Sequence, residues 1–83
     1  MPASPDGSKE LLEYVVKSLV DNPDEVHVSE AGHAREMILQ LSVAGADMGR
    51  VIGKNGRVIN SIRALVQVAA AKEGKNVSVE ILE

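Results

Sequence analysis

The sequence predicts an α+β fold, in the order α-β-β-α-α-β, in which a three-stranded mixed sheet carries three helices on one face. Apolar residues recur at spacings of one, three and four in two long stretches, 11–20 and 58–70, which is typical of amphipathic helices. They alternate with polar residues in three short stretches, which is typical of half-buried strands. The length of 83 residues allows one small domain.

The N-terminal segment predicts a flexible tail followed by a helix. Residues 1–7 include two prolines and a glycine, so we expect a flexible tail there and a single domain over 8–83. Ser8 or Asp6 is expected to supply the oxygen that caps the first helix. Pro23 ends that helix, because proline forces the preceding residue out of helical geometry. The expected inward stripe is Leu11, Leu12, Val15, Val16, Leu19 and Val20.

A hairpin and a crossover are expected next. Residues 25–30 alternate as a short strand, 31–33 form a turn, and 35–43 form a longer strand. Ile38 either faces outward, lining a groove or a dimer surface, or belongs to the core with the alternation shifted by one residue. A short helix over 47–52 and a long one ending near Gly74 precede the last strand, 77–81. The second strand, the two helices and the last strand make a crossover, which is right-handed when the two strands are parallel, and we expect the long second strand at the centre of a mixed sheet. The inward face of the long helix is expected to be Val58, Ile59, Ile62, Leu65, Val66, Ala69 and Ala70.

The composition excludes several classes of protein. There is no cysteine, which excludes disulfides, thiolate metal sites and thiol catalysis. Tyr14 is the single aromatic residue, which argues against modules that stack bases on aromatic rings. No apolar run approaches the ~20 residues of a membrane span, and the N-terminus carries no export signal. We therefore expect a cytoplasmic location and no association with a membrane.

No catalytic or metal-binding constellation can be assembled from the sequence. His27 and His33 lack further ligands in a convincing arrangement, so surface histidines are the better interpretation. No Ser-His-Asp or paired-carboxylate arrangement can be argued. The glycines around Lys54 are not followed by the Gly-Lys-Ser/Thr of a nucleotide-hydrolysing loop. We therefore expect a protein that is not an enzyme and that uses no metal or cofactor.

Charge is distributed unevenly along the chain. Residues 1–47 carry three bases against nine acids, whereas residues 48–83 carry six bases against three acids. No acid stands between Met48 and Lys72. Although the net charge of −3 disfavours a nucleic-acid-binding protein, a local basic patch matters more to an anion than the total. Arg63 and Lys72, on the long helix, are equally well explained as solubilising charges or as RNA contacts.

The segment Gly53-Lys54-Asn55-Gly56 interrupts two helices and is the candidate site. Its backbone amides stand at the N-terminus of a helix and suit a phosphodiester, with Lys54 at the tip and Arg50 and Arg57 on either side. The plainer interpretation is an ordinary turn, since Asn-Gly favours turns. Gly49 and Gly53 continue a spacing of four from Gly45; close backbone packing is the better interpretation for Gly49, less so for Gly53.

Residues 51–59, Val-Ile-Gly-Lys-Asn-Gly-Arg-Val-Ile, resemble the signature of the KH domain, apolar-Ile-Gly-x-x-Gly-x-x-Ile. The element order is similar to the type II arrangement of that fold. Residues 9–82 resemble the short bacterial single-KH RNA-binding proteins of the KhpA family. The resemblance implies that Gly53, Lys54, Asn55 and Gly56 clamp the backbone of about four nucleotides of single-stranded RNA. It also implies that Ile52, Val58 and Ile59 divide between the groove floor and the core.

The resemblance implies partners as well. Members of the family associate as homodimers and with a larger KH-containing partner, KhpB. They are implicated in RNA chaperone-like, post-transcriptional regulation that affects cell shape and peptidoglycan homeostasis.

Two hypotheses follow: a single-stranded RNA-binding module, or a dimerisation and interaction subunit whose RNA binding depends mainly on its partner. If Arg50, Lys54, Arg57 and Arg63 supply roughly 2–4 phosphate contacts, one domain alone binds RNA weakly.

Overall fold

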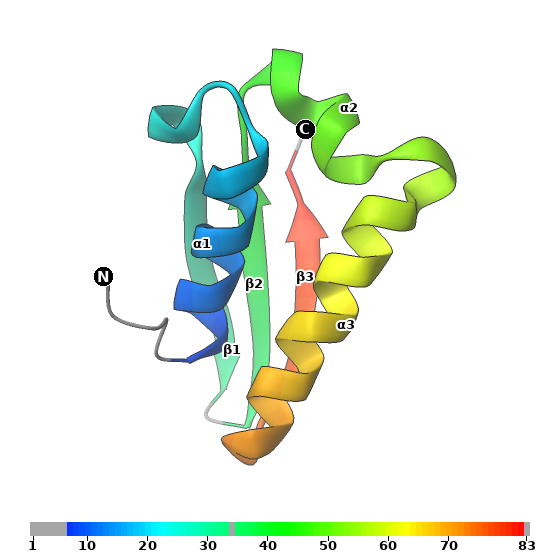
Figure 1. Ribbon diagram of the computed structural model, residues 1–83. Coiled ribbons are helices and arrows are strands. Elements are labelled where there is room, and N and C mark those ends of the chain that lie inside the picture. The colour runs from blue at the N-terminus through cyan, green and yellow to red at the C-terminus, as the bar shows by residue number, and fades with distance from the viewer. Residues whose placement is uncertain (1–6, 34, 83) are drawn as a thin grey trace, which may run out of the picture.

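The computed structural model describes residues 7–33 and 35–82, and it confirms the predicted element order. The predicted tail, 1–7, lies outside the described residues except for Gly7. Short 3₁₀ turns precede β1, α2 and α3. The helices and strands are α1 (Ser8–Leu19), β1 (His27–His33), β2 (Glu36–Ser42), α2 (Met48–Ile52), α3 (Arg57–Lys72) and β3 (Asn76–Ile81) (Figure 1).

The sheet has the predicted mixed topology, with strand order β1-β2-β3. β2 pairs antiparallel with β1 and parallel with β3, so the long second strand is central. The position of the hairpin turn was wrong in the prediction, because residues 31–33 continue β1 and pair with β2 up to His33 opposite Glu36. Gly32 suggested a turn, but it serves close approach of the strands: a Cβ there would lie 2.2 Å from the Glu36 carbonyl oxygen.

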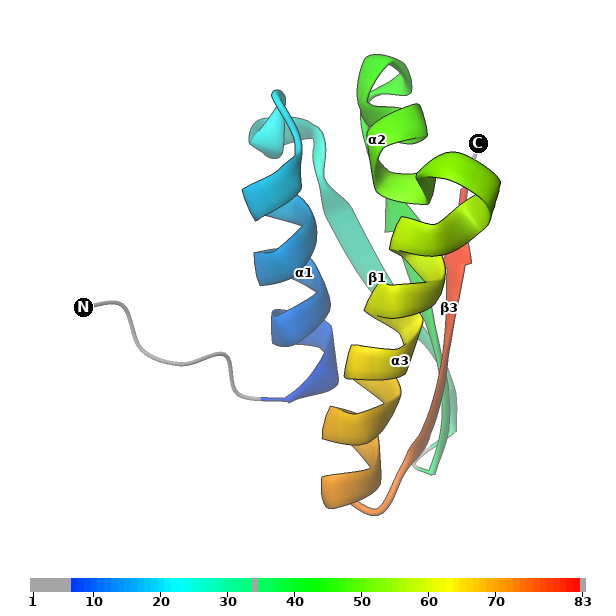
Figure 2. The same ribbon diagram turned by 45° about the vertical axis from the view of Figure 1, so that its right-hand side comes forward.

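The helices lie on one side of the sheet, with α1 and α3 side by side and α2 at the end of that layer (Figures 1 and 2). The alternation predicted for β2 is confirmed, since Leu39 and Leu41 are fully buried against the helices. Ile38 lies on the opposite face, half-buried and outside the core. The buried core consists of Leu12, Val16, Val26, Leu39, Leu41, Val51, Ile59, Ile62, Val66, Ala70, Val77 and Val79.

Three details of the helices differ from the prediction. Leu19, the last residue of α1, was expected on the inward stripe but is 36% exposed. Leu65 was expected in the core but is 55% exposed, because Ile62, Val66 and Ala70 already fill the stripe of α3 that faces the sheet. At the start of α1 the residue before the first turn is Gly7, and no side chain of residues 7–33 and 35–82 caps the helix. Ser8 is instead a buried residue of the first turn, and Asp6 lies outside the described residues. The predicted stop at Gly74 is confirmed, with the Lys75 amide donating to the Ala70 carbonyl.

Candidate nucleic-acid interface

The loop between α2 and α3 adopts a conformation that few sequences can follow. Gly53, Asn55 and Gly56 all have positive φ, at 75°, 59° and 73°. Glycine enters this region freely, and asparagine is one of the few other residues that do so routinely. The Gly56 amide donates to the Gly53 carbonyl at 3.2 Å, which closes the turn. The four residues therefore form one tight corner that leads directly into the first turn of α3 (Figure 2).

Gly53 is the residue for which the corner leaves no room. A Cβ there would lie 2.4 Å from Cγ2 of Val58 and 2.9 Å from the backbone nitrogen of Val58. At Gly56 the nearest atom to such a Cβ, the Asn60 side-chain nitrogen, is 3.6 Å away. Close packing was expected at Gly49 more than at Gly53, and the structure reverses this: a Cβ at Gly49 would meet nothing within 4 Å.

The tip of the loop combines exposed polar side chains with the start of a long helix. Lys54, Asn55 and Arg57 are all exposed. Within the described part of the chain no side chain caps the N-terminus of α3, and of the amides in its first turn the one of Arg57 donates to the Lys54 carbonyl. Because the positive end of the helix dipole also lies there, this corner suits an anion such as a phosphodiester.

The apolar residues of the motif divide between surface and core. Ile59 is buried and belongs to the core, whereas Ile52 and Val58 are partly buried and pack against the core from the side of the loop. Ile52 and Val58 therefore carry the apolar surface that adjoins the exposed tip at Lys54.

Two of the basic residues singled out in the sequence already have partners within the protein. Arg63 is partly buried, and its Nε donates to the Val79 carbonyl on β3 at 3.2 Å, while its Nη1 donates to the Asn60 side chain. Arg50 pairs with Asp21 at 3.1 Å, and the same nitrogen lies 3.4 Å from the Leu19 carbonyl at the end of α1. Lys54 and Arg57 are therefore the basic side chains at the loop to which the structure assigns no ion pair among the described residues.

Asp47, just before α2, was missed by the sequence analysis. Its side chain is 2% exposed, yet it does not cap α2. It accepts hydrogen bonds from the backbone amides of Asp21 and Asn22 and from the Asn22 side chain, at 3.2, 3.1 and 3.1 Å. Partners 25 residues away leave no local signal. The one hint in the sequence was that Asp47 is the last acid before the acid-free stretch that begins at Met48.

The environment of Asp47 favours its charged form. Burial by itself would raise the pKa of the carboxyl, because the carboxylate loses water. The hydrogen bonds from Asp21 and Asn22, together with the charge of Arg50, outweigh this effect. The pKa of Asp47 therefore lies below its ordinary value of 3.8.

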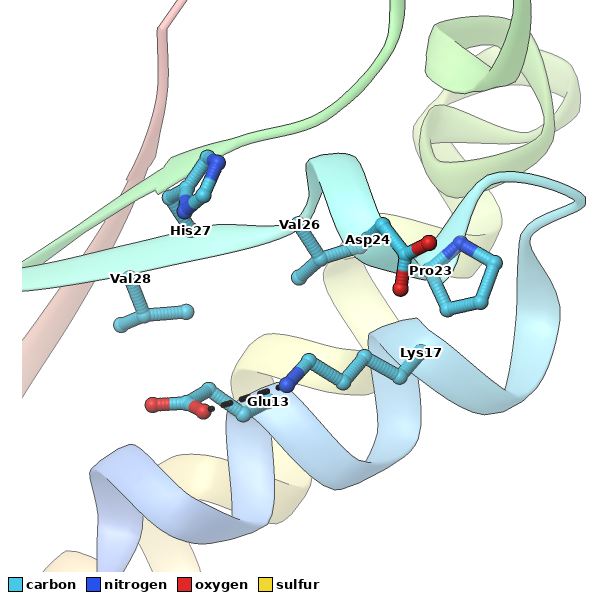
Figure 3. Close-up of a pocket in the computed structure, with 7 residues that line it drawn as sticks. All are labelled: Glu13, Lys17, Pro23, Asp24, Val26, His27 and Val28. Atoms are coloured by element: carbon cyan, nitrogen blue, oxygen red, sulfur yellow. Dashed lines mark ion pairs between the residues drawn. The ribbon is translucent and has the colours of Figure 1, made fainter.

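One hollow in the surface away from the loop is less suited to nucleic acid. It has a volume of about 450 Å³ and lies between α1 and the start of β1 (Figure 3). Its walls include Glu13, which pairs with Lys17 at 3.7 Å, and Asp24. These carboxylates repel phosphate. Among residues 7–33 and 35–82, no group of three His, Asp or Glu side chains could hold a metal ion, and no helix could cross a membrane.

Comparison with known families matches residues 9–81 to the family described as KhpA/KhpB, KH domain. The chain belongs to this family. RNA-binding protein KhpA of Clostridium acetobutylicum is 55% identical over 74 residues, which cover 89% of this chain and 99% of that protein. RNA-binding protein KhpA of Chlamydia trachomatis is 47% identical over 75 residues, or 90% and 96% of the two chains.

Membership of the family confirms the resemblance that residues 51–59 carry, and the architecture agrees with a type II KH fold. A crystal structure of Era from Aquifex aeolicus is similar in fold, with a TM-score of 0.65 at 15% identity. The match covers 89% of this chain and 29% of that one, and at this identity it speaks for the fold alone.

Proposed function

We propose that this protein binds single-stranded RNA and that its Gly53–Gly56 loop clamps the RNA backbone. The observation that carries the proposal is the corner itself: three positive-φ residues, an exposed Lys54 and uncapped amides at the start of α3. Relatives that align with 89–90% of this chain bear the name RNA-binding protein KhpA, which supports the choice of ligand.

Each part of the loop has a distinct role in this proposal. Gly53 and Gly56 let a sugar-phosphate backbone approach without meeting a side chain, and the α3 amides donate to its phosphate oxygens. Lys54 and Arg57 add charge, and Asn55 adds hydrogen-bond donors. Ile52 and Val58 offer apolar surface for bases, which fits a chain whose only aromatic residue, Tyr14, lies on α1. Arg63, on α3, is proposed as a further contact for the RNA.

The test is a titration of short random RNA at several salt concentrations with wild type and with Lys54→Asp combined with Asn55→Asp. Aspartate tolerates the left-handed backbone of position 55, so the variant keeps its fold while the loop becomes acidic. We expect salt-sensitive binding by the wild type and no measurable binding by the variant. Because each lost phosphate contact lowers the log–log salt slope for single strands by about 0.7, any residual binding shows a shallower slope.

A matched control separates loop chemistry from total charge. Lys17→Glu with Ser18→Glu lowers the net charge by the same amount, but on α1, which lies away from the loop in both views (Figures 1 and 2). This control should retain RNA affinity. If the folded loop variant binds RNA as well as the control does, the clamp is refuted. A folded wild type without RNA affinity refutes single-domain RNA binding.

We propose in addition that the protein forms a homodimer through α3. Leu65 and Val68 stand one turn apart on that helix, 55% and 64% exposed, although they are large apolar side chains. Sedimentation at micromolar concentration should show a dimer that Leu65→Asp converts to a monomer with unchanged circular dichroism. A monomeric wild type would exclude this interface.

The remaining parts of the proposed function concern the cell. We propose that the protein is a binding protein without catalytic activity, and that it acts in the cytoplasm with a larger KhpB-like partner. The process it serves, post-transcriptional RNA regulation that affects cell shape and peptidoglycan homeostasis, is proposed on the resemblance to the family. Deletion of the gene should alter cell shape, and a copy with the acidic loop should fail to restore it.

A further inference from the structure

We propose that Asp47 and Arg50 are positioning residues for the Gly53–Gly56 loop. They do this by holding α2 against the end of α1 and the segment that follows it. This inference rests on the proposed function, since it names how the RNA-binding loop is held in place. It also gives Arg50 a role distinct from that of a phosphate contact.

α2 depends on contacts with the rest of the protein, because it is too short to be stable as an isolated helix. It has five residues, and a helix this short is unstable alone, since nucleation is costly and few of its hydrogen bonds form. Its one fully buried side chain is Val51. Its last turn runs straight into the loop, where the Gly53 amide donates to the Gly49 carbonyl at 2.8 Å. Any shift of α2 is therefore transmitted to the loop.

Asp47 is the stronger of the two fastenings. An aspartate before a helix ordinarily caps that helix, but this carboxylate turns to the segment after α1 and accepts three hydrogen bonds from Asp21 and Asn22. Hydrogen bonds to a charged group are stronger than those between neutral groups, and removing the acceptor leaves three part-buried donors without this partner. All three donors belong to Asp21 and Asn22, so these hydrogen bonds fix Asp47, the residue directly before α2, against the segment that follows α1.

Arg50 fastens the same segment one turn further along α2. Its Nη1 reaches both the Asp21 carboxylate and the Leu19 carbonyl, which is one of the free acceptors at the end of α1. The side chains of Arg50 and Asp21 are 55% and 73% exposed, so this ion pair by itself stabilises little. The ion pair instead sets the orientation of the guanidinium, which points toward the end of α1. The loop leaves α2 on the side away from α1 (Figure 2).

The first experiment removes the Asp47 acceptor and follows the loop. Asp47→Ala should accelerate amide hydrogen exchange at Gly53 and Gly56 and raise the Kd for short single-stranded RNA. If the loop then holds its binding geometry about a tenth of the time, the Kd rises roughly tenfold. The salt slope should stay unchanged, because no phosphate contact is lost. Asp47→Asn keeps one acceptor oxygen and should lie between wild type and Asp47→Ala.

Two controls separate positioning from general weakening and from charge. Val16→Ala opens a cavity in the core at a buried residue of α1, without removing a polar group of Asp47 or Arg50. Asp24→Ala removes an exposed acid from the same connecting segment. Measured where every variant is folded by circular dichroism, both controls should retain wild-type Kd and wild-type exchange at Gly53 and Gly56.

A second experiment decides the role of Arg50. Arg50→Gln should raise the Kd while leaving the salt slope at the wild-type value. A slope lowered by about 0.7 would show that Arg50 contacts a phosphate and would overturn its assignment. Unchanged Kd and unchanged exchange in Asp47→Ala would overturn the assignment of Asp47. If the wild type binds no RNA, the proposed function fails, and the exchange of Gly53 and Gly56 in Asp47→Ala still decides the positioning role.

Discussion

Replacing each of three glycines around the loop by alanine should have three different effects on stability. At Gly53, alanine must adopt φ 75° and ψ 173°, a region occupied essentially by glycine, at a cost of about 1–3 kcal/mol. Its Cβ would also lie 2.9 Å from the backbone nitrogen of Val58, which belongs to α3 and cannot swing aside. Overpacking of this kind costs typically about 1–3 kcal/mol. The free energy of unfolding should therefore fall by about 2–6 kcal/mol.

At Gly56 alanine meets only the backbone strain, and at Gly49 it meets neither the strain nor the steric clash. Gly56 is left-handed, which costs alanine about 1–2 kcal/mol, but its Cβ has room. The lower entropy of the unfolded chain returns about 0.4–1 kcal/mol. Gly49 is helical and unobstructed, so alanine should stabilise the protein by up to about 1 kcal/mol. For a chain of 83 residues the total stability is only about 4–12 kcal/mol, so Gly53→Ala removes a large share.

The assay is thermal denaturation followed by circular dichroism. At about 4–8 °C per kcal/mol for a domain of this size, Gly53→Ala should lower Tm by roughly 10 °C or more and Gly56→Ala by a few degrees. Gly49→Ala should raise it. Adding Val58→Ala to Gly53→Ala removes the 2.4 Å contact with Cγ2 but not the one with the backbone nitrogen, so recovery should be partial. Equal Tm values for Gly53→Ala and Gly56→Ala would refute the reasoning from Val58.

Three further predictions concern the rest of the fold. Because the pKa of Asp47 lies below 3.8 in the folded protein, the ionised carboxylate stabilises the fold at neutral pH. This contribution is lost as pH falls below about 4. The Tm of Asp47→Asn should therefore depend less on pH than the Tm of the wild type between about pH 5 and pH 3. Leu39→Ala, at a fully buried position of the central strand, should cost about 2–5 kcal/mol in urea denaturation, and a loss under 1 kcal/mol would contradict the assigned core. Arg63→Ala should lower Tm, and Arg63→Lys should recover it only partly, because a lysine cannot donate to Val79 and Asn60 with the same planar fork.

Much of the fold could be predicted because it depends on local patterns. The stripe on α3 and the alternation on β2 each repeat within a few residues, so one segment suffices to say which side faces the core. Chain length and connection rules then place β3 parallel to β2. The loop was also readable, since glycines around two polar residues between helices are a local signal. The hairpin turn was misplaced because Gly32 has two uses, and only the pairing partner decides between them.

By itself, the sequence determined the element order, the mixed sheet, the position of the loop and the concentration of positive charge after Met48. Only the tertiary structure decided which polar side chains form hydrogen bonds within the protein. Asp47 meets Asn22 across 25 residues, Arg50 meets Asp21 across 29, and Arg63 meets Val79 across 16. The physical reason is that periodicity records the face on which a side chain lies, whereas a hydrogen bond depends on which two faces the packed core brings together.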